Sequence, residues 1–165
     1  GIATLNKKNK VWNIDKVNEP FNFVHSGFNI RATDLQAFIG LLQLKKVERI
    51  MKARHKNHVR YHEQLSVDFQ LQNYGETWPV SLHIGILAKD SLTRDKVLGL
   101  CREKRIETRV WSHGNLGRHP FWKEKYGIFN GEWSNEIYNR GFILPTYPEL
   151  NSEDIDYIAS ICNKY

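Results

Sequence analysis

The sequence predicts an α+β fold, in which a small, mostly antiparallel sheet is covered by helices on one side and preceded by one long helix. Three observations lead to this prediction. A segment with helical spacing of apolar residues begins at Thr33, short alternating segments typical of strands follow it, and a capped helical segment closes the sequence. The predicted order is long helix, strand, helix, strand, loop, short helices, strand and helix.

The long helix is predicted to run from residue 33 to about residue 65. Thr33 and Gln36 have the spacing of a capping box, in which each side chain accepts a hydrogen bond from the backbone N–H of the other residue. Apolar residues then recur on one face from Leu35 to Tyr61. Globular helices typically have about 8 to 20 residues, so this length favours a partner domain against which the helix packs.

The rest of the sequence alternates between strand and helix patterns. Three short segments have the alternation of strands, namely 78–87, 106–111 and 142–144. Four segments have helical spacing, namely about 90–104, 121–125, 134–140 and 151–161. Asp90 and Asn151 have side chains that suit the N-caps of the first and last of these helices. The glycine-containing segment 112–120 is predicted to be a loop.

The composition is that of a globular domain. The chain has 165 residues, 41% of them hydrophobic and 25% charged, which argues against extended disorder. No segment approaches about 18 consecutive apolar residues, and no secretory signal core is visible, so we expect a cytoplasmic protein without a membrane partner. We therefore expect Cys101 and Cys162 to be reduced thiols. Cys101 lies on an apolar helical stripe, which predicts a role in core packing.

The net charge of +6 includes a concentration of basic residues in the segment 45–60. Such a bias favours anionic partners, and a basic nucleic-acid-binding module is one alternative function. Nucleic acid is disfavoured because no known nucleic-acid motif occurs and the aromatic residues mostly have core-like spacing. His55, His58 and His62 in the same segment have a spacing that could bind a metal, but the surrounding lysines and arginines would repel it. A solvated basic face is the preferred interpretation, and no metal site is predicted.

Two polar segments are candidate binding sites, and no catalytic residue is predicted. Asn29 and Arg31 precede the capped helix, whose free backbone N–H groups and dipole favour a phosphate. A shaped turn followed by a solvated arginine explains them equally well. In the loop from His113 to Arg118, glycines allow close backbone approach and polar groups can converge on a ligand. On these residues alone a polar surface loop is the preferred interpretation there.

The segment 27–44, GFNIRATDLQAFIGLLQL, closely resembles the signature of the DegT/StrS-type sugar aminotransferases. Those are fold-type-I pyridoxal-phosphate enzymes that act on nucleotide-linked keto-sugars. Further similarities follow in the family's order, at Arg54, Tyr61 and Leu65 and in the segments 106–109, 144–148 and 154–158. The resemblance covers residues 21–165. It implies a remnant of the large cofactor-binding domain with its phosphate loop at 1–32, a bridging helix at 33–66 and a small C-terminal α+β domain at 67–165.

The resemblance also implies roles for the candidate residues. Asn29 would reach the phosphate of pyridoxal 5'-phosphate in the neighbouring subunit of a homodimer, with Arg31 close by. His113, Asn115 and Arg118 are then candidates for contacts with a nucleotide-sugar substrate. The family's catalytic lysine, which forms a Schiff base with the cofactor, lies upstream of the matching motif. No lysine near the start of this sequence has a matching context, so we expect a fragment that is inactive alone.

The loop leaves two reactions open. Related sugar 3-dehydratases share the fold and the cofactor, replace the catalytic lysine with histidine, and often show the pattern G-N-L-x-R-x-P. Residues 114–120, GNLGRHP, fit that pattern. An aminotransferase for surface-polysaccharide or deoxysugar biosynthesis is preferred because its family is larger, and a 3-dehydratase using the pyridoxal or pyridoxamine form of the cofactor is the alternative. A non-catalytic, partner-binding relative is a further alternative.

Overall fold

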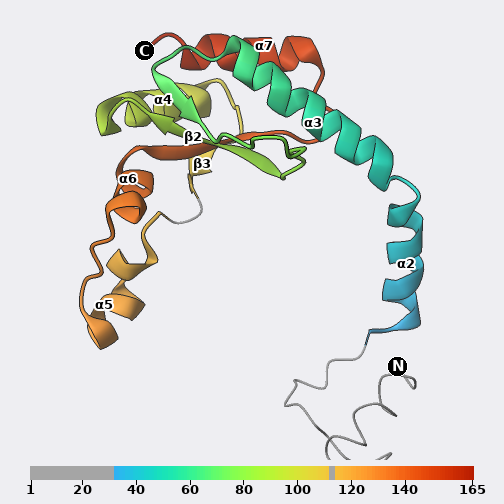
Figure 1. Cartoon of the computed structure of the whole chain (residues 1–165), viewed down its shortest axis with the longest axis horizontal. Helices are drawn as coiled ribbons and strands as arrows, with labels where there is room; N and C mark the ends of the chain where they lie inside the picture. The colour runs from blue at the N-terminus through green and yellow to red at the C-terminus, as the bar shows by residue number, and fades with distance from the viewer. Residues whose placement is uncertain (1–31, 112–113) are drawn as a thin grey trace, which may run out of the picture. The chain divides into compact units, whose positions relative to one another are not determined.

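The computed structural model describes residues 32–111 and 114–165 (Figure 1). The chain divides into two compact units between Leu41 and Leu42, and residues 32–41 are the described part of the first unit. The sheet and all helices from α3 onward belong to the second unit. None of the described helices is long and apolar enough to cross a membrane. The predicted boundaries of the bridging helix, at residue 33, and of the small C-terminal domain, at residue 67, stay predictions.

The first helical segment consists of two helices. α2 spans Asp34–Leu44 and α3 spans Val47–Gln64. Between them the Lys46 N–H donates to the Gln43 carbonyl at 2.9 Å, a bond to the third preceding residue that tightens the turn. The prediction of one continuous helix is therefore wrong at this point. The apolar spacing continues across the break, so the pattern alone could not reveal it.

Three helices begin where the sequence places their caps. The capping box of α2 is confirmed, because the Thr33 N–H donates to Gln36 Oε1 at 2.9 Å and the Gln36 N–H donates to Thr33 Oγ1 at 3.3 Å. The Asp90 carboxylate accepts from the N–H three residues later at 2.7 Å. Asn151 and Asp154 form a second capping box with two bonds of 2.9 Å. Each cap satisfies backbone donors that the first helical turn leaves free.

The later helices agree closely with the prediction. They are α4 (Ser91–Glu103), the 3-10 turn η3 (Leu116–Arg118), α5 (Pro120–Tyr126), α6 (Glu132–Arg140) and α7 (Ser152–Cys162). All four helices predicted after the long segment are found, with ends that differ from the predicted ones by at most two residues.

The described residues form one four-stranded antiparallel sheet in the order β1-β2-β4-β3, which confirms the α+β class. Its strands are β1 (Phe69–Leu71), β2 (His83–Ala88), β3 (Arg109–Val110) and β4 (Gly141–Pro145). β1 was not predicted, because its three residues carry too little alternation to be recognised. β2 starts five residues later than predicted; Pro79, which has no N–H for strand pairing, lies in the preceding segment.

The main core lies between one face of the sheet and the helices α3, α4 and α7 (Figure 1). The sheet contributes alternate buried residues of its two central strands, and the helices contribute residues with helical spacing. The fully buried members with the largest side chains include Tyr61, Ile84, Ile86, Val97, Cys101, Phe142, Leu144, Ile155 and Cys162. The predicted packing role of Cys101 is confirmed, and both cysteines are free thiols. Each large side chain buried here contributes about 1.5 to 3 kcal/mol.

The second face of the sheet is covered differently from the prediction, which placed the helices on one side. Gly85 and Gly141 point to this face, because Leu87 pairs with Gly141 and lies two residues from Gly85. A Cβ atom at Gly85 would overlap the indole ring of Trp111. At Gly141 it would overlap the Ile137 carbonyl of α6. The two missing side chains thus leave room for a tryptophan and for the end of a helix.

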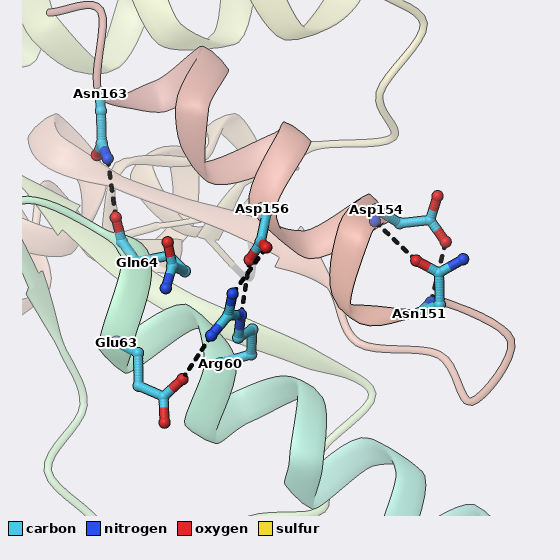
Figure 2. A network of polar contacts seen from close by, with 7 residues as sticks. All are labelled: Arg60, Glu63, Gln64, Asn151, Asp154, Asp156 and Asn163. Carbon is cyan, nitrogen blue, oxygen red and sulfur yellow. Dashed lines mark hydrogen bonds and ion pairs between the residues drawn. The ribbon is translucent and has the colours of Figure 1, made fainter.

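α3 and α7 are joined by a polar network (Figure 2). The Arg60 guanidinium donates two bonds to the Asp156 carboxylate, of 2.6 and 2.7 Å, and a third to Glu63 at 3.0 Å. The pKa of Asp156 is lowered mainly by its hydrogen bonds from Arg60. The Asn163 amide donates to the Gln64 carbonyl at 2.8 Å. Bidentate geometry orients the two helices, although ion pairs this exposed contribute only about 0 to 1 kcal/mol.

His58 of α3 is fully buried between this helix and the segment before β2. Its Nε2 lies 3.0 Å from Ser81 Oγ, and its Nδ1 lies 3.3 Å from the Tyr74 hydroxyl. Ser81 Oγ donates its own hydrogen to the His83 carbonyl at 2.7 Å, so it accepts from Nε2–H. In the neutral ring Nδ1 is then the acceptor, and the Tyr74 hydroxyl donates to it. Burial lowers the pKa of His58 to about 4.

The predicted solvated face is wrong for this histidine. His58 points inward, whereas His62 is exposed and His55 packs against Trp78 with ring centroids 4.7 Å apart. His58 is buried because residues 74–81 pack over α3. The spacing of the three histidines along the helix does not indicate this packing. Among the residues that the structure describes, no group of histidine, cysteine, aspartate or glutamate side chains could hold a metal ion.

Candidate functional site

The predicted loop follows β3, and residues 114–119 of it are described. Gly114 has a φ of 63°, a conformation that favours glycine, and a Cβ atom there would lie 2.8 Å from the Tyr138 ring. The glycine therefore lets the loop approach α6 closely. The loop prediction is confirmed over this described part, and the turn η3 forms within it.

Asn115 fixes the shape of this loop. Its side chain is buried, and both N–H donors of the amide are used, to the Phe129 carbonyl and to Asn135 Oδ1, each at 2.9 Å. The amide oxygen accepts from the Gly117 N–H at 2.9 Å. The side chain therefore points into the protein and ties the loop to the segment between α5 and α6. The predicted contact of Asn115 with substrate stays a prediction.

A pocket of about 370 Å³ lies beside the loop. It is lined by Arg94 at the start of α4, Val110 of β3, Gly114 and His119 of the loop, and Tyr138 of α6. Four separate parts of the second unit therefore meet at one cavity. Its size is within the range of about 300 to 1,000 Å³ that small-molecule sites occupy.

Two guanidinium groups flank the aromatic wall of the pocket. The Arg118 guanidinium carbon lies 4.9 Å from the centroid of the Tyr138 ring, a cation–π contact. Arg94 donates to the Tyr138 carbonyl at 3.0 Å and pairs with Asp95 at 2.7 Å. Arg118 is exposed and has no carboxylate partner among the described residues. The arrangement suits a ligand that combines negative charge with polar groups, since an unpaired guanidinium binds phosphate or hydroxyl oxygens well.

The remaining predicted site residues, Asn29, Arg31 and His113, lie outside the described residues, so their roles stay predictions. The described residues next to Asn29 and Arg31 are compatible with an anion. The backbone N–H groups of Asp34 and Leu35, at the start of α2, make no hydrogen bond within the described structure. N–H groups at a helix N-terminus that have no partner among the described residues favour a phosphate.

Sequence reasoning did not select four residues of the pocket, one of which, Val110, was assigned only to a strand. Arg94 and Tyr138 are distant from the loop in sequence and were assigned only to helices. His119 lies within the predicted loop but was not singled out. The only feature that points to Tyr138 is Gly114, which lies next to it in space. The close approach of these two residues becomes visible only in the folded chain.

Comparison with known proteins identifies one family that matches almost the whole chain. The sequence profile of the DegT/DnrJ/EryC1/StrS aminotransferase family matches residues 1–163. A dTDP-4-dehydro-2,6-dideoxy-D-glucose 3-dehydratase from Saccharopolyspora spinosa is 30% identical over 147 residues, which cover 84% of this chain and 32% of that protein. The chain therefore spans about a third of the length of this relative.

Solved structures share the fold. An Escherichia coli GDP-4-keto-6-deoxy-D-mannose-3-dehydratase with bound hydrated PLP has a TM-score of 0.71 and 22% identity, covering 90% of this chain and 40% of the other. The Helicobacter pylori aminotransferase PseC, involved in the biosynthesis of pseudoaminic acid, has a TM-score of 0.74 and 21% identity, covering 87% of this chain and 40% of the other. At these identities the similarity shows that the architecture is shared.

Proposed function

Because the chain belongs to the DegT/DnrJ/EryC1/StrS aminotransferase family, we propose that it forms part of a pyridoxal-phosphate-dependent enzyme acting on nucleotide-linked keto-sugars. The family match over residues 1–163 is the observation that carries this proposal. The enzyme would work in the cytoplasm, in the biosynthesis of a surface polysaccharide or a deoxysugar. Its activity requires the rest of such a protein, since this chain spans about a third of the Saccharopolyspora relative.

Amino transfer is the general expectation for the family, and two observations favour 3-dehydration as a second candidate reaction. Residues 114–120 read GNLGRHP, the loop pattern of the 3-dehydratases. The Saccharopolyspora relative is also a 3-dehydratase by name. Mass spectrometry of the product distinguishes the two reactions, because the 3-dehydratase product keeps its keto group and lacks the oxygen of the 3-hydroxyl, whereas amino transfer replaces a keto group with an amine.

The chain would contribute to two parts of the active site. Asn29 and Arg31 would hold the phosphate of pyridoxal 5'-phosphate next to the free N–H groups of α2. When bound, this cofactor supplies an electron sink for the sugar chemistry. Arg118 and His113 would bind the nucleotide-sugar at the pocket beside Tyr138, and Asn115 would hold their loop in place. The guanidinium of Arg118, which contacts the Tyr138 ring and has no carboxylate partner among the described residues, supports this division of roles.

Separate effects on cofactor and substrate are expected from two substitutions in the complete enzyme. Asn29→Ala should weaken pyridoxal phosphate binding by about tenfold or more, because it removes a hydrogen bond to a charged phosphate. Arg118→Ala should raise the KM for the nucleotide-sugar by a similar factor and leave cofactor binding unchanged. Cofactor absorbance and steady-state kinetics measure both, and each variant controls for the other. Unchanged constants in Arg118→Ala would contradict the substrate role of the loop.

The proposed homodimer gives Asn29 a role across the subunit interface. A mixed dimer should combine one subunit carrying Asn29→Ala with a partner that lacks the catalytic residue of the large domain. If Asn29 serves the neighbouring site, both defects fall on one site and the other keeps its activity, so about half of the wild-type rate remains. If each subunit instead carries its own defect, the one site with a catalytic residue binds the cofactor more weakly, so at limiting pyridoxal phosphate the rate falls well below half; Asn29 then acts within its own chain and the proposal is wrong.

A further inference from the structure

We propose that Asn135 of α6 is a positioning residue for the described loop 114–119. It holds Asn115 at the base of this loop and thereby sets where the Arg118 guanidinium lies. The sequence pattern assigned Asn135 only to a helix, and the contacts that carry the inference all lie within the second unit. The effect on the loop is independent of the proposed function, whereas the effect on a nucleotide-sugar rests on it.

Asn135 is the partner of Asn115 that a substitution can remove. The Asn115 side chain is held by three groups, of which the Phe129 carbonyl and the Gly117 N–H belong to the backbone. Asn135 Oδ1 is the third group and accepts from the Asn115 amide at 2.9 Å. Asn115 is 2% exposed, so the loss of this acceptor would leave a buried N–H unsatisfied. We therefore expect Asn115 to move towards another acceptor when Asn135 is truncated.

The loop has a second attachment that does not depend on Asn135. The Phe129 N–H donates to the Gly117 carbonyl at 3.2 Å. A Cβ atom at Gly117 would overlap the Phe129 Cβ, so the two residues are in close contact. These contacts should keep the turn η3 attached to the segment between α5 and α6. Truncation of Asn135 is therefore expected to displace the loop without unfolding it.

Helix α6 contacts both ends of η3. Asn135 and Tyr138 are three residues apart, so they lie next to each other on one side of the helix. Asn135 binds Asn115, which is the N-cap of η3. The Tyr138 ring centroid lies 4.9 Å from the guanidinium carbon of Arg118, the last residue of η3. Because η3 is three residues long, a movement of Asn115 is passed on to Arg118.

The position of Arg118 matters for a phosphorylated ligand. Among the described residues no carboxylate pairs with Arg118, so its contacts with η3 and Tyr138 determine where the guanidinium lies. A guanidinium binds phosphate or hydroxyl oxygens through directional N–H bonds, which weaken when the donor is displaced. In the proposed enzyme Asn135 therefore raises the affinity for the nucleotide-sugar without touching it.

NMR spectra of the 165-residue chain test the effect on the loop. The ring current of Tyr138 shifts the side-chain signals of Arg118, and Asn135→Ala should move these signals towards their values in an unfolded chain. Asn135→Asp should largely keep the shifts, because a carboxylate oxygen still accepts from Asn115. Asn139→Ala is the matched control, since Asn139 is exposed on the same helix. Unchanged Arg118 signals in Asn135→Ala, or an equal change in Asn139→Ala, would overturn the inference.

Kinetics of the complete enzyme test the effect on the substrate. Asn135→Ala should raise the KM for the nucleotide-sugar by about fivefold, with little change in kcat or in pyridoxal phosphate binding, and Asn135→Asp should restore most of the loss. In the double variant with Arg118→Ala, the KM should stay close to that of Arg118→Ala alone. Independent effects would instead multiply to about fiftyfold, which would show that Asn135 does not act through Arg118.

The two experiments separate this inference from the proposed function. If Arg118→Ala leaves the KM unchanged, the substrate role of the loop is wrong, and the Arg118 signals still decide whether Asn135 positions the loop. If the Arg118 signals do not respond to Asn135→Ala, the positioning role is wrong, and the proposed function stands on the family match.

Discussion

Replacing Gly85 with alanine is expected to lower the free energy of unfolding by about 2 to 3 kcal/mol. The new Cβ atom would overlap the indole ring of Trp111, which lies directly on the glycine. Trp111 also packs closely on Gly141, since a Cβ atom built at Gly141 would lie 3.0 Å from the Trp111 Cβ. The ring therefore has little room to move. Urea denaturation followed by circular dichroism measures the loss.

Gly99 provides the matched control. It lies in α4, and a Cβ atom there would meet nothing within 4 Å. Gly99→Ala should therefore stabilise the chain by about 0.5 to 1 kcal/mol, the difference in helix propensity. In a double-mutant cycle, Trp111→Leu should remove most of the additional cost of Gly85→Ala. Wild-type stability in Gly85→Ala would show that the ring does not pack on the glycine.

A loss of about 3 kcal/mol of folding stability is expected when the pH falls from about 6.5 to about 4. His58 is the cause, because burial lowers its pKa in the folded chain from 6.5 to about 4. Above pH 6.5 the ring is neutral in both states, and its stabilising contacts are fully present. Below that pH the unfolded chain takes up a proton that the folded chain does not, so the free energy of unfolding decreases until the folded pKa is reached.

The pH slope identifies the residue responsible. His58→Gln removes the titrating ring. The free energy of unfolding of this variant should therefore depend much less on pH between 6.5 and 4, whatever its value at neutral pH. His62→Gln is the comparison: burial lowers the pKa of His62 as well, but this ring is exposed on the same helix, so its removal should change the slope less than the removal of His58. Denaturant unfolding at several pH values measures the slope for each variant. An unchanged slope in His58→Gln would show that other groups cause the acid sensitivity.

Structure determined by neighbours in sequence was predictable. The caps at Thr33, Asp90 and Asn151 were identified correctly because each acts through a side chain and a backbone group about three residues away. The later helices were located for the same reason, since their apolar spacing is local. The family resemblance, which rests on a continuous segment before and within α2, is confirmed by the profile match.

Features set by distant contacts were not predictable. The burial of His58 depends on Tyr74 and Ser81, which pack over α3 from a segment without regular structure. β1 exists because Phe69–Leu71 pairs with β2. The break between α2 and α3 likewise left no trace in the apolar spacing.

The candidate site was predictable only in its loop. Asn115 and Arg118 were selected from sequence, but the wall of the pocket comes from Arg94 and Tyr138, which the fold brings from other elements. The inward direction of the Asn115 amide depends on Phe129 and Asn135, after the following helix. A polar residue in a glycine-rich loop has the same sequence pattern whether it faces a ligand or its own backbone.

The packing of α3 against α7 has a consequence for the order of events during protein synthesis. Arg60 and Asp156, which join the two helices, are 96 residues apart, and Ile155 and Ile158 fill the core from the last helix. The ribosome releases α3 long before α7. The apolar side chains of α3 and the sheet therefore stay exposed to water until α7 emerges. Contacts this distant in sequence make folding slow and leave the waiting chain open to aggregation.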